Sequence, residues 1–424
     1  MLLKEKPWYP WLVVALLWGV ALLNYMDRQM LSTMKPSMMQ DIRELEMAEN
    51  FGRLMAVFLW IYGLVSPVAG LIADRVNRKW LITASLGVWS FVTLMMGYAT
   101  TFEQLYVLRA IMGISEALYI PAGLALIADY HRGGTRSLAV GIHMTGLYAG
   151  QALGGFGATV AHQWSWQTAF HTFGFIGIAY SLLLILFLHE KRTDNLPQTS
   201  DETTLMGWLK SMKSSLSLLL TMFSFWVILF YFAVPSLPGW AVKNWLPTLF
   251  SETLSIDMSK AGPLCTIIIA ASSFLGVITG GIIADRWIGK NLKGRIYTSA
   301  TGIFLTIPAL LLTGYGNGFL SIAAGGVIFG IGFGMFDANN MPILCQFVSS
   351  RHRAAGYGLM NMAGVFAGAL VTTWLGKSTD AGHLGRDLAL LSIPVAIFLT
   401  LFLVSLKPET ADKKQDTGNQ NPQN

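Results

Sequence analysis

Charged residues are scarce in this sequence. Only 12% of its 424 residues are charged, whereas 53% are hydrophobic. A soluble domain usually carries about 25% charged residues, and a soluble chain of this length would need two or three polar-surfaced domains. The shortage of charge therefore excludes a soluble protein and predicts an all-α membrane protein.

Cysteines and catalytic motifs are also scarce. The two cysteines, Cys265 and Cys345, both fall in apolar runs, which argues against a disulfide framework or a metal site. The chain has no nucleotide-binding loop, metal-ligand cluster or nucleophile–base set. We therefore expect no cofactor, no metal and no enzymatic activity.

Long apolar runs are abundant. A membrane span needs about 20 mostly apolar residues to cross roughly 30 Å of hydrocarbon. Twelve runs meet this need, in two sets of six: 10–34, 53–73, 80–99, 105–129, 137–160 and 168–189, then 216–247, 261–284, 296–315, 319–347, 354–376 and 388–406. The first run is too long for a signal peptide and contains charges, so we expect it to be retained.

These runs predict twelve transmembrane helices in two six-helix bundles. We expect an N-terminal bundle over 1–190, a cytoplasmic linker over 191–215 and a C-terminal bundle over 216–407. The polar, Gln- and Asn-rich tail at 408–424 is predicted to be disordered and cytoplasmic.

The distribution of basic residues predicts an orientation. Of the 29 Lys and Arg, three fall within or at the edge of spans and six on the outer side (Arg43, Arg53, Lys243, Lys260, Lys377 and Arg386), which leaves 20 on the inner side. This bias satisfies the positive-inside rule. It places both termini in the cytoplasm of a multi-pass protein, with a bacterial inner membrane as the expected location. The net charge of +6 is then a topology signal, so we expect no nucleic-acid partner.

Two short motifs recur at nearly one offset. Gly70-x3-Asp74-Arg75 ends the second run, and Gly281-x3-Asp285-Arg286 follows it by 211 residues. Arg136-x4-Gly141 opens the fifth run, and Arg353-x4-Gly358 follows it by 217 residues. The pairs predict duplicated halves. The glycines allow close helix approach, and we expect the charged residues to make inter-helix contacts at the cytoplasmic face.

The first motif carries a resemblance. Gly70-x3-Asp74-Arg75-x-Asn77-Arg78-Lys79 is similar to the signature loop of the major facilitator superfamily. That family implies two six-helix bundles around a central cavity, working by alternating access. Asn77 stands where glycine is usual, and because asparagine tolerates a left-handed backbone, we expect the turn to be kept.

Charges inside the runs are candidates for function, because each costs about 2.5–3.5 kcal/mol on insertion scales. The first run contains Asp27 and Arg28, which are adjacent and cannot point the same way; one is expected to line the cavity and the other to meet a neighbouring helix. In the fourth run Arg109 and Glu116 return to one helix face, with Gly113 as a notch between them.

The second half offers less charge. Only Asp337 lies at comparable depth there, so we expect the coupling chemistry mostly in the first half. Whether Asp337 takes part stays open, as does His143, which is either a proton relay or a packed polar residue. Trp240 and Tyr231 either line the cavity or face lipid.

The four first-half charges sum to zero when both acids are ionised. An anion would draw the arginines from their carboxylate partners, and a buried carboxylate without its cation favours the protonated form. Anion and proton would then bind together, which is symport. The alternative is a purely structural ion-pair network.

Two motifs sharpen the resemblance. Asn24-Tyr25-x-Asp27-Arg28 and Arg109-x3-Gly113-x2-Glu116-Ala117 are similar to the anion:cation symporter branch, which includes hexuronate and galactonate permeases and sialin-type carriers. The resemblance implies proton coupling at Asp27 and Glu116. It implies substrate binding at Arg28, Arg109, Tyr25, Tyr62 and Asn361.

The chain also departs from the sugar-acid permeases. Thr145-Gly146-Leu147 replaces their Ser-Gly-Gln, and Val365 stands where they have asparagine, with Asn361 one turn earlier. The expected substrates are a small organic anion, such as a sugar acid or sialic acid, and protons, carried by a monomer in contact with membrane lipid. A Spinster-like exporter of lysolipid or another amphipath is the alternative, and a non-transporting membrane sensor is a third class.

Overall fold

The structure is a computed structural model that describes residues 6–131, 135–191, 217–348 and 353–405. The predicted linker and tail lie outside these ranges, apart from Lys191. The side chains of Asp74, Arg75 and Arg353 also lie outside the described part.

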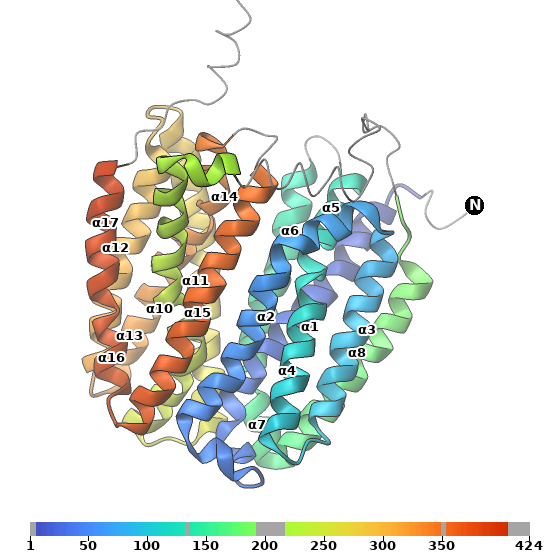
Figure 1. Cartoon of the computed structure of the whole chain (residues 1–424), viewed down its shortest axis with the longest axis vertical. Coiled ribbons are helices and arrows are strands. Elements are labelled where there is room, and N and C mark those ends of the chain that lie inside the picture. The colour runs from blue at the N-terminus through green and yellow to red at the C-terminus, as the bar shows by residue number, and fades with distance from the viewer. Residues whose placement is uncertain (1–5, 132–134, 192–216, 349–352, 406–424) are drawn as a thin grey trace, which may run out of the picture.

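All regular secondary structure among the described residues is helical. The first half holds α1 (Tyr9–Met38), a short 3-10 turn η2 (Arg43–Glu46), α2 (Ala48–Arg75), α3 (Arg78–Met96), α4 (Phe102–Ala117), α5 (Tyr119–Tyr130), α6 (Arg136–Gly154), α7 (Gly157–Gln163) and α8 (Trp166–Phe187). The second half holds α10 (Phe223–Leu254), α11 (Met258–Ile288), α12 (Gly294–Tyr315), α13 (Phe319–Asp337), α14 (Asn340–Phe347), α15 (Arg353–Asp380), α16 (Leu384–Leu390) and α17 (Ser392–Ser405). In Figure 1 the two halves stand side by side.

These helices confirm the predicted all-α membrane fold. Within the described ranges, 11 helical segments are long and apolar enough to span a membrane. The remaining span is α6 continued by α7, which packs along α1 and α11. Its serine, histidine, threonine and glutamine residues make it less apolar than the others. α6 and α15 begin at Arg136 and Arg353, the arginines of the repeated motif.

Two spans are interrupted at matching places. The fourth span breaks between α4 and α5 at Leu118, and the tenth breaks between α13 and α14 at residues 338–339. A proline lacks the N–H that would bond the carbonyl four residues earlier. Pro121 therefore leaves the carbonyl of Ala117 without that donor, and Pro342 does the same for Ala338. Each break follows closely after an acidic residue within the span.

The halves pack tightly at one end. We call the end with the connections at 76–77 and 289–293 the basic end, and the end with those at 39–47, 255–257 and 381–383 the far end. At the far end α11 approaches the junction between α6 and α7 through glycines, since a Cβ on Gly262 would lie 2.8 Å from the carbonyl oxygen of Gly155. Such an approach of two backbones requires glycine on both segments.

A polar latch joins the same end. The carboxylate of Asp380, at the end of α15, accepts hydrogen bonds from the backbone N–H groups of Ala48 (2.6 Å) and Glu49 (2.8 Å). These are the first residues of α2, where a negative charge also meets the positive end of the helix dipole. Lys377 pairs with Glu49 at 3.4 Å. The latch ties α15 of one half to α2 of the other.

The basic end is more open. A Cβ on Gly70, Gly141 or Gly281 would meet no described atom within 4 Å. Asp337 is exposed although it lies inside a span, and Tyr357 is 41% exposed on α15. Among the described residues, the halves are therefore in close contact at the far end and leave Asp337 and Tyr357 exposed toward the basic end.

We expect Asp380→Asn to loosen the far end. The neutral amide has one acceptor oxygen in place of two and no negative charge for the two N–H groups. The far end should therefore lose about 1 kcal/mol of closing free energy, and the population of the state open at this end should rise roughly fivefold. Distances between spin labels at Met47 and Ala381, measured by double electron–electron resonance, would report the opening of the far end. Glu46→Gln, an exposed change on η2, is the control. An unchanged distance distribution in the Asp380 variant would contradict the latch.

Candidate functional site

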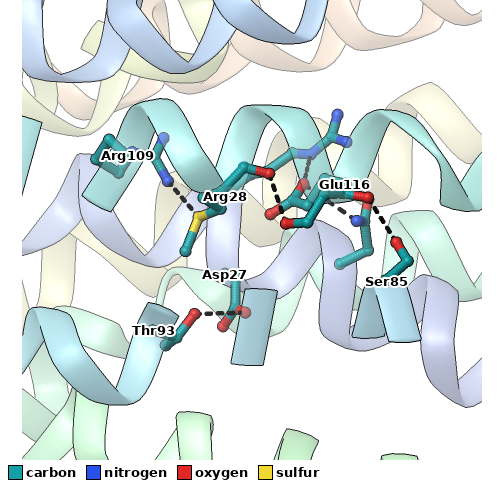
Figure 2. Close-up of polar contacts among 9 residues, drawn as sticks. Asp27, Arg28, Ser85, Thr93, Arg109 and Glu116 are labelled. Carbon is teal, nitrogen blue, oxygen red and sulfur yellow. Dashed lines mark hydrogen bonds and ion pairs between the residues drawn. The ribbon is translucent and has the colours of Figure 1, made fainter. Parts of the chain in front are cut away.

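A buried ion pair lies at the centre of the first half. Arg28 on α1 and Glu116 on α4 form it, with Nε and Oε2 2.6 Å apart. Asn24, one turn before Arg28, donates from Nδ2 to the same oxygen at 3.0 Å. Glu116 is completely buried. Figure 2 shows these groups reaching each other from neighbouring helices.

Aromatic rings surround the guanidinium of Arg28. Its Cζ lies 5.0 Å from the ring centre of Tyr25, 5.0 Å from that of Phe58 and 4.6 Å from that of Tyr62. Ring faces attract a desolvated cation, so they hold the side chain between α1 and α2. The structure thus brings Tyr25 and Tyr62 to Arg28, while the predicted role of these residues in substrate binding stays a prediction.

Asn361 is connected to this group through one intervening residue, Ser66. Its Nδ2 donates to Ser66 Oγ at 3.2 Å, and Ser66 donates to the carbonyl of Tyr62 at 2.8 Å. Asn361 belongs to α15, so the contact crosses from the second half to the first. The described contacts link it to the site only through Ser66.

Asp27 points away from Arg28. Its Oδ2 accepts a hydrogen bond from Thr93 Oγ1 on α3 at 3.1 Å, as Figure 2 shows. This confirms that the adjacent charges face different directions. Among the described residues Asp27 has no ion-pair partner within 4.0 Å, and burying an ionised carboxylate on a single hydroxyl is costly. Its predicted role in proton coupling stays a prediction.

Arg109 is buried without a carboxylate partner in the described part. Its Nη1 donates to Met112 Sδ at 3.1 Å, and its Cζ lies 4.6 Å from the Phe58 ring centre. The notch at Gly113 explains the position of that ring, since a Cβ there would lie 2.8 Å from the carbonyl oxygen of Phe58. Gly113 therefore lets α2 lie directly against α4, and Phe58 contacts both arginines.

The group has unused hydrogen-bonding capacity. Arg28 Nη2, Arg109 Nε, Glu116 Oε1 and Asn24 Oδ1 are buried and have no partner among the described residues. Buried polar atoms are nearly always paired, so four orphans in one cluster are unusual. Two of them are guanidinium donors, which suit the oxygens of a carboxylate or phosphate.

A cavity of about 70 Å³ lies between the halves. Its polar lining comes from α1, α6, α10, α11 and α13: Tyr25, Tyr148, Gln151, Lys243, Ser273 and Asp337. Tyr25 also touches Arg28, so the cavity adjoins the buried pair.

Lys243 was wrongly predicted on the outer side. The run containing it was expected to end at Pro247, but α10 continues to Leu254 and includes Pro235, Pro238 and Pro247. The extra length moves the outer end of the helix away from Lys243, which therefore lies inside the span and lines the cavity. The one sequence signal for this position was a lysine within an unusually long apolar run.

The signature loop fastens the basic end of the first half. Arg78 forms an ion pair with Asp129 of α5, which joins the start of α3 to α5, and its predicted role in the conformational motif stays a prediction. The expectation of a left-handed Asn77 was wrong, since its φ is −58°. Asn77 caps α3 instead, accepting from Trp80 N–H at 3.1 Å, which is a common role of asparagine.

The second copy of the loop makes a weaker contact. Asp285 pairs with Arg295 of α12 at 3.3 Å and is exposed, as is Arg286. Gly70 and Gly281 face no described atom. The inter-helix contacts of Asp74 and Arg75 stay predictions.

His143 is packed against Tyr119. Its Nε2 lies 2.8 Å from the Tyr119 hydroxyl, which donates to the carbonyl of Leu17 at 2.7 Å. Because that hydroxyl proton is already used, Nε2 carries the proton of the His–Tyr bond. Neither residue contacts the Arg28–Glu116 pair.

The comparisons with known proteins agree with this architecture. Residues 17–372 match the Major Facilitator Superfamily model, and the chain belongs to that superfamily. It is a secondary transporter and not an enzyme.

Relatives named as anion transporters and as spinster proteins match the chain. The chain is 25% identical to the chloroplastic ascorbate transporter of Arabidopsis thaliana, over 89% of this chain and 72% of that protein. It is 25% identical to the probable anion transporter 4 of Oryza sativa, over 89% of this chain and 66% of that one. It is 28% identical to human protein spinster homolog 1, covering 71% of this chain and 60% of the relative. These relatives confirm the resemblance to anion transporters.

A solved structure shares the fold. An inward-facing, unoccupied bacterial homologue of the human lysosomal transporter Spinster aligns with a TM-score of 0.76 at 18% identity, over 94% of this chain and 97% of that chain.

Proposed function

We propose that this transporter couples the uptake of a small organic anion, such as a sugar acid or sialic acid, to protons. The observation that carries the proposal is the buried Arg28–Glu116 pair, in which the arginine keeps a free donor and the carboxylate a free oxygen. An anion can therefore approach Arg28 before the pair breaks.

The coupling follows from the exchange of partners. An anion arriving beside Tyr25 meets Arg28 Nη2, pairs with the guanidinium and draws it from Glu116. Glu116 then keeps only Asn24 as a hydrogen-bond donor. A buried carboxylate in that setting favours its neutral form, so it takes up one proton for each negative charge bound. Arg109 adds positive potential across Phe58 and holds the anion.

The orientation belongs to the same proposal. The basic end would face the cytoplasm of a bacterial cell, by the distribution of Lys and Arg. The opening at the basic end then corresponds to the inward-facing state, from which substrate leaves, and the transporter would act as a monomer.

Uptake by the purified transporter in liposomes tests the proposal. We expect a proton gradient directed inward to drive accumulation of at least one of D-galactonate, D-glucuronate, N-acetylneuraminate and L-ascorbate. A protonophore should abolish accumulation and leave exchange of labelled for unlabelled anion. Accumulation that persists with the protonophore would contradict proton coupling.

A lysolipid exporter is the second candidate, favoured by the identity to spinster homologues. It requires a cavity that admits an acyl chain. Movement of labelled lysophosphatidylcholine between leaflets, with no uptake of the four anions, would establish this alternative.

A further inference from the structure

The second half carries a charged pair at positions equivalent to the first. Glu116-Ala117-x3-Pro121 on the fourth span is matched by Asp337-Ala338-x3-Pro342 on the tenth, 221 residues later. Both acids directly precede a proline-induced break, at Leu118 and at residues 338–339. Asp337 is therefore the repeat counterpart of Glu116.

The cations correspond as well. Lys243 follows Arg28 by 215 residues, within the range of the offsets at the other repeats. Each has an aromatic residue three positions earlier, Tyr25 and Trp240, and each lies over that ring, at 5.0 Å for Arg28 Cζ and 5.6 Å for Lys243 Nζ. Sequence offset and local contact thus agree that Lys243 is the counterpart of Arg28.

The two pairs differ in one respect. Arg28 and Glu116 are in contact, whereas the ammonium of Lys243 makes no hydrogen bond or ion pair with any residue that the structure describes. This ammonium lies between aromatic rings, 5.6 Å from Trp240 and 5.3 Å from Phe333. Asp337 lines the same cavity and accepts from Asn340 Nδ2 at 3.2 Å. Lys243 and Asp337 therefore line one cavity without forming an ion pair.

The two cations belong to helices of different halves, α1 and α10, that contact each other. Gln29, next to Arg28, donates to the main-chain carbonyl of Lys243 at 2.8 Å. Tyr25, which contacts Arg28, lines the cavity together with Lys243. One small anion can therefore lie between a cation from α1 and a cation from α10.

We propose that Lys243 is the second-half ligand of the transported anion and that Asp337 competes with the anion for it. The inference rests on the proposed anion transport and names a residue from each half for the same site. Without substrate, the carboxylate of Asp337 provides the counter-charge of Lys243. With substrate, an anion bridges Arg28 and Lys243 and joins the two halves, because each cation is fixed to a different half.

Affinity measurements test the competition. Binding of D-galactonate, D-glucuronate, N-acetylneuraminate and L-ascorbate to the detergent-purified transporter would be measured by calorimetry at one pH. We expect Lys243→Gln to weaken binding about 10- to 100-fold, since it removes a charged hydrogen bond, and Lys243→Arg to restore most of it. Asp337→Asn should tighten binding about 3- to 10-fold by removing a like charge.

A double variant isolates the pair. In the Lys243→Gln background Asp337→Asn should no longer tighten binding, because coupled residues are not additive. Lys260→Gln and Glu46→Gln, both exposed, are controls with the same charge changes and should leave affinity unchanged. Equal tightening by Asp337→Asn in both backgrounds, or no loss in Lys243→Gln, would overturn the inference. Melting temperatures would confirm that the variants are folded.

A further variant, Arg28→Gln, separates this inference from the proposed function. If Arg28→Gln weakens binding and Lys243→Gln does not, the anion site at Arg28 is supported and the proposed role of Lys243 is wrong. If the wild-type transporter binds none of the four anions, both fall together.

Discussion

Glu116→Gln should abolish proton-driven accumulation and preserve exchange. In a 1:1 symporter with the membrane potential held at zero, an inward gradient of one pH unit supports about tenfold accumulation of a monoanion, since one pH unit corresponds to about 1.4 kcal/mol. The amide is permanently neutral, so it cannot carry a proton across, and we expect the ratio of internal to external anion to fall to about one.

The same variant should still bind the anion. Its side-chain amide would keep an oxygen for the Asn24 donor, whose bond to the native carboxylate is 3.0 Å long, and Arg28 would be free for the anion. Counterflow of labelled anion should therefore continue at a substantial rate. Glu103→Gln, on α4 outside the site, is the matched control. Loss of counterflow together with accumulation, in a folded variant, would indicate a structural role for Glu116.

Gly262→Leu should block transport by a different route. A Cβ at Gly262 would lie 2.8 Å from the carbonyl oxygen of Gly155, and a leucine adds three further carbons. The backbone of Gly155 cannot relieve this clash by changing rotamer, as a side chain could. Closing the far end around the leucine should therefore cost about 3 kcal/mol. That cost lowers the population of the state described here by more than about 100-fold.

Spin labels and transport assays together test this expectation. The distance between labels at Met47 and Ala381 should increase in Gly262→Leu, and the initial rates of counterflow and of proton-driven uptake should both fall by more than about 100-fold. Thr279→Leu, on an exposed face of the same helix, should change neither. A Gly262→Leu variant that transports normally would show that this contact does not have to form.

The scaffold and the first-half site could be predicted from sequence because their signals are local. Apolar runs define the spans, and spacing within one helix places Arg109, Gly113 and Glu116 on one face. Likewise, adjacent positions on α1 required Asp27 and Arg28 to diverge, which the contact with Thr93 confirms. The partner of each charge was a tertiary contact, so the pairing of Arg28 with Glu116 could not be derived.

Lys243 shows why the second half was misjudged. Pro247 suggested the end of a span, but inside a bundle a proline can be accommodated by neighbouring helices, and α10 continues to Leu254. When Lys243 is placed outside the membrane, the second half has no buried cation to accompany Asp337, so the sequence does not suggest a charged pair equivalent to Arg28 and Glu116. Asn77 was misjudged for a similar reason, since a residue that tolerates a left-handed turn can equally cap a helix.

Proton uptake on anion binding tests the central claim most directly. Calorimetric titration of the purified transporter with a bound anion, in buffers of different ionisation enthalpy, gives the number of protons taken up per anion. If Arg28 leaves Glu116 to pair with the anion, the wild type should take up about one proton for each monoanion bound, and Glu116→Gln should take up none. Binding with no proton uptake by the wild type, at a pH where transport is proton-driven, would contradict it.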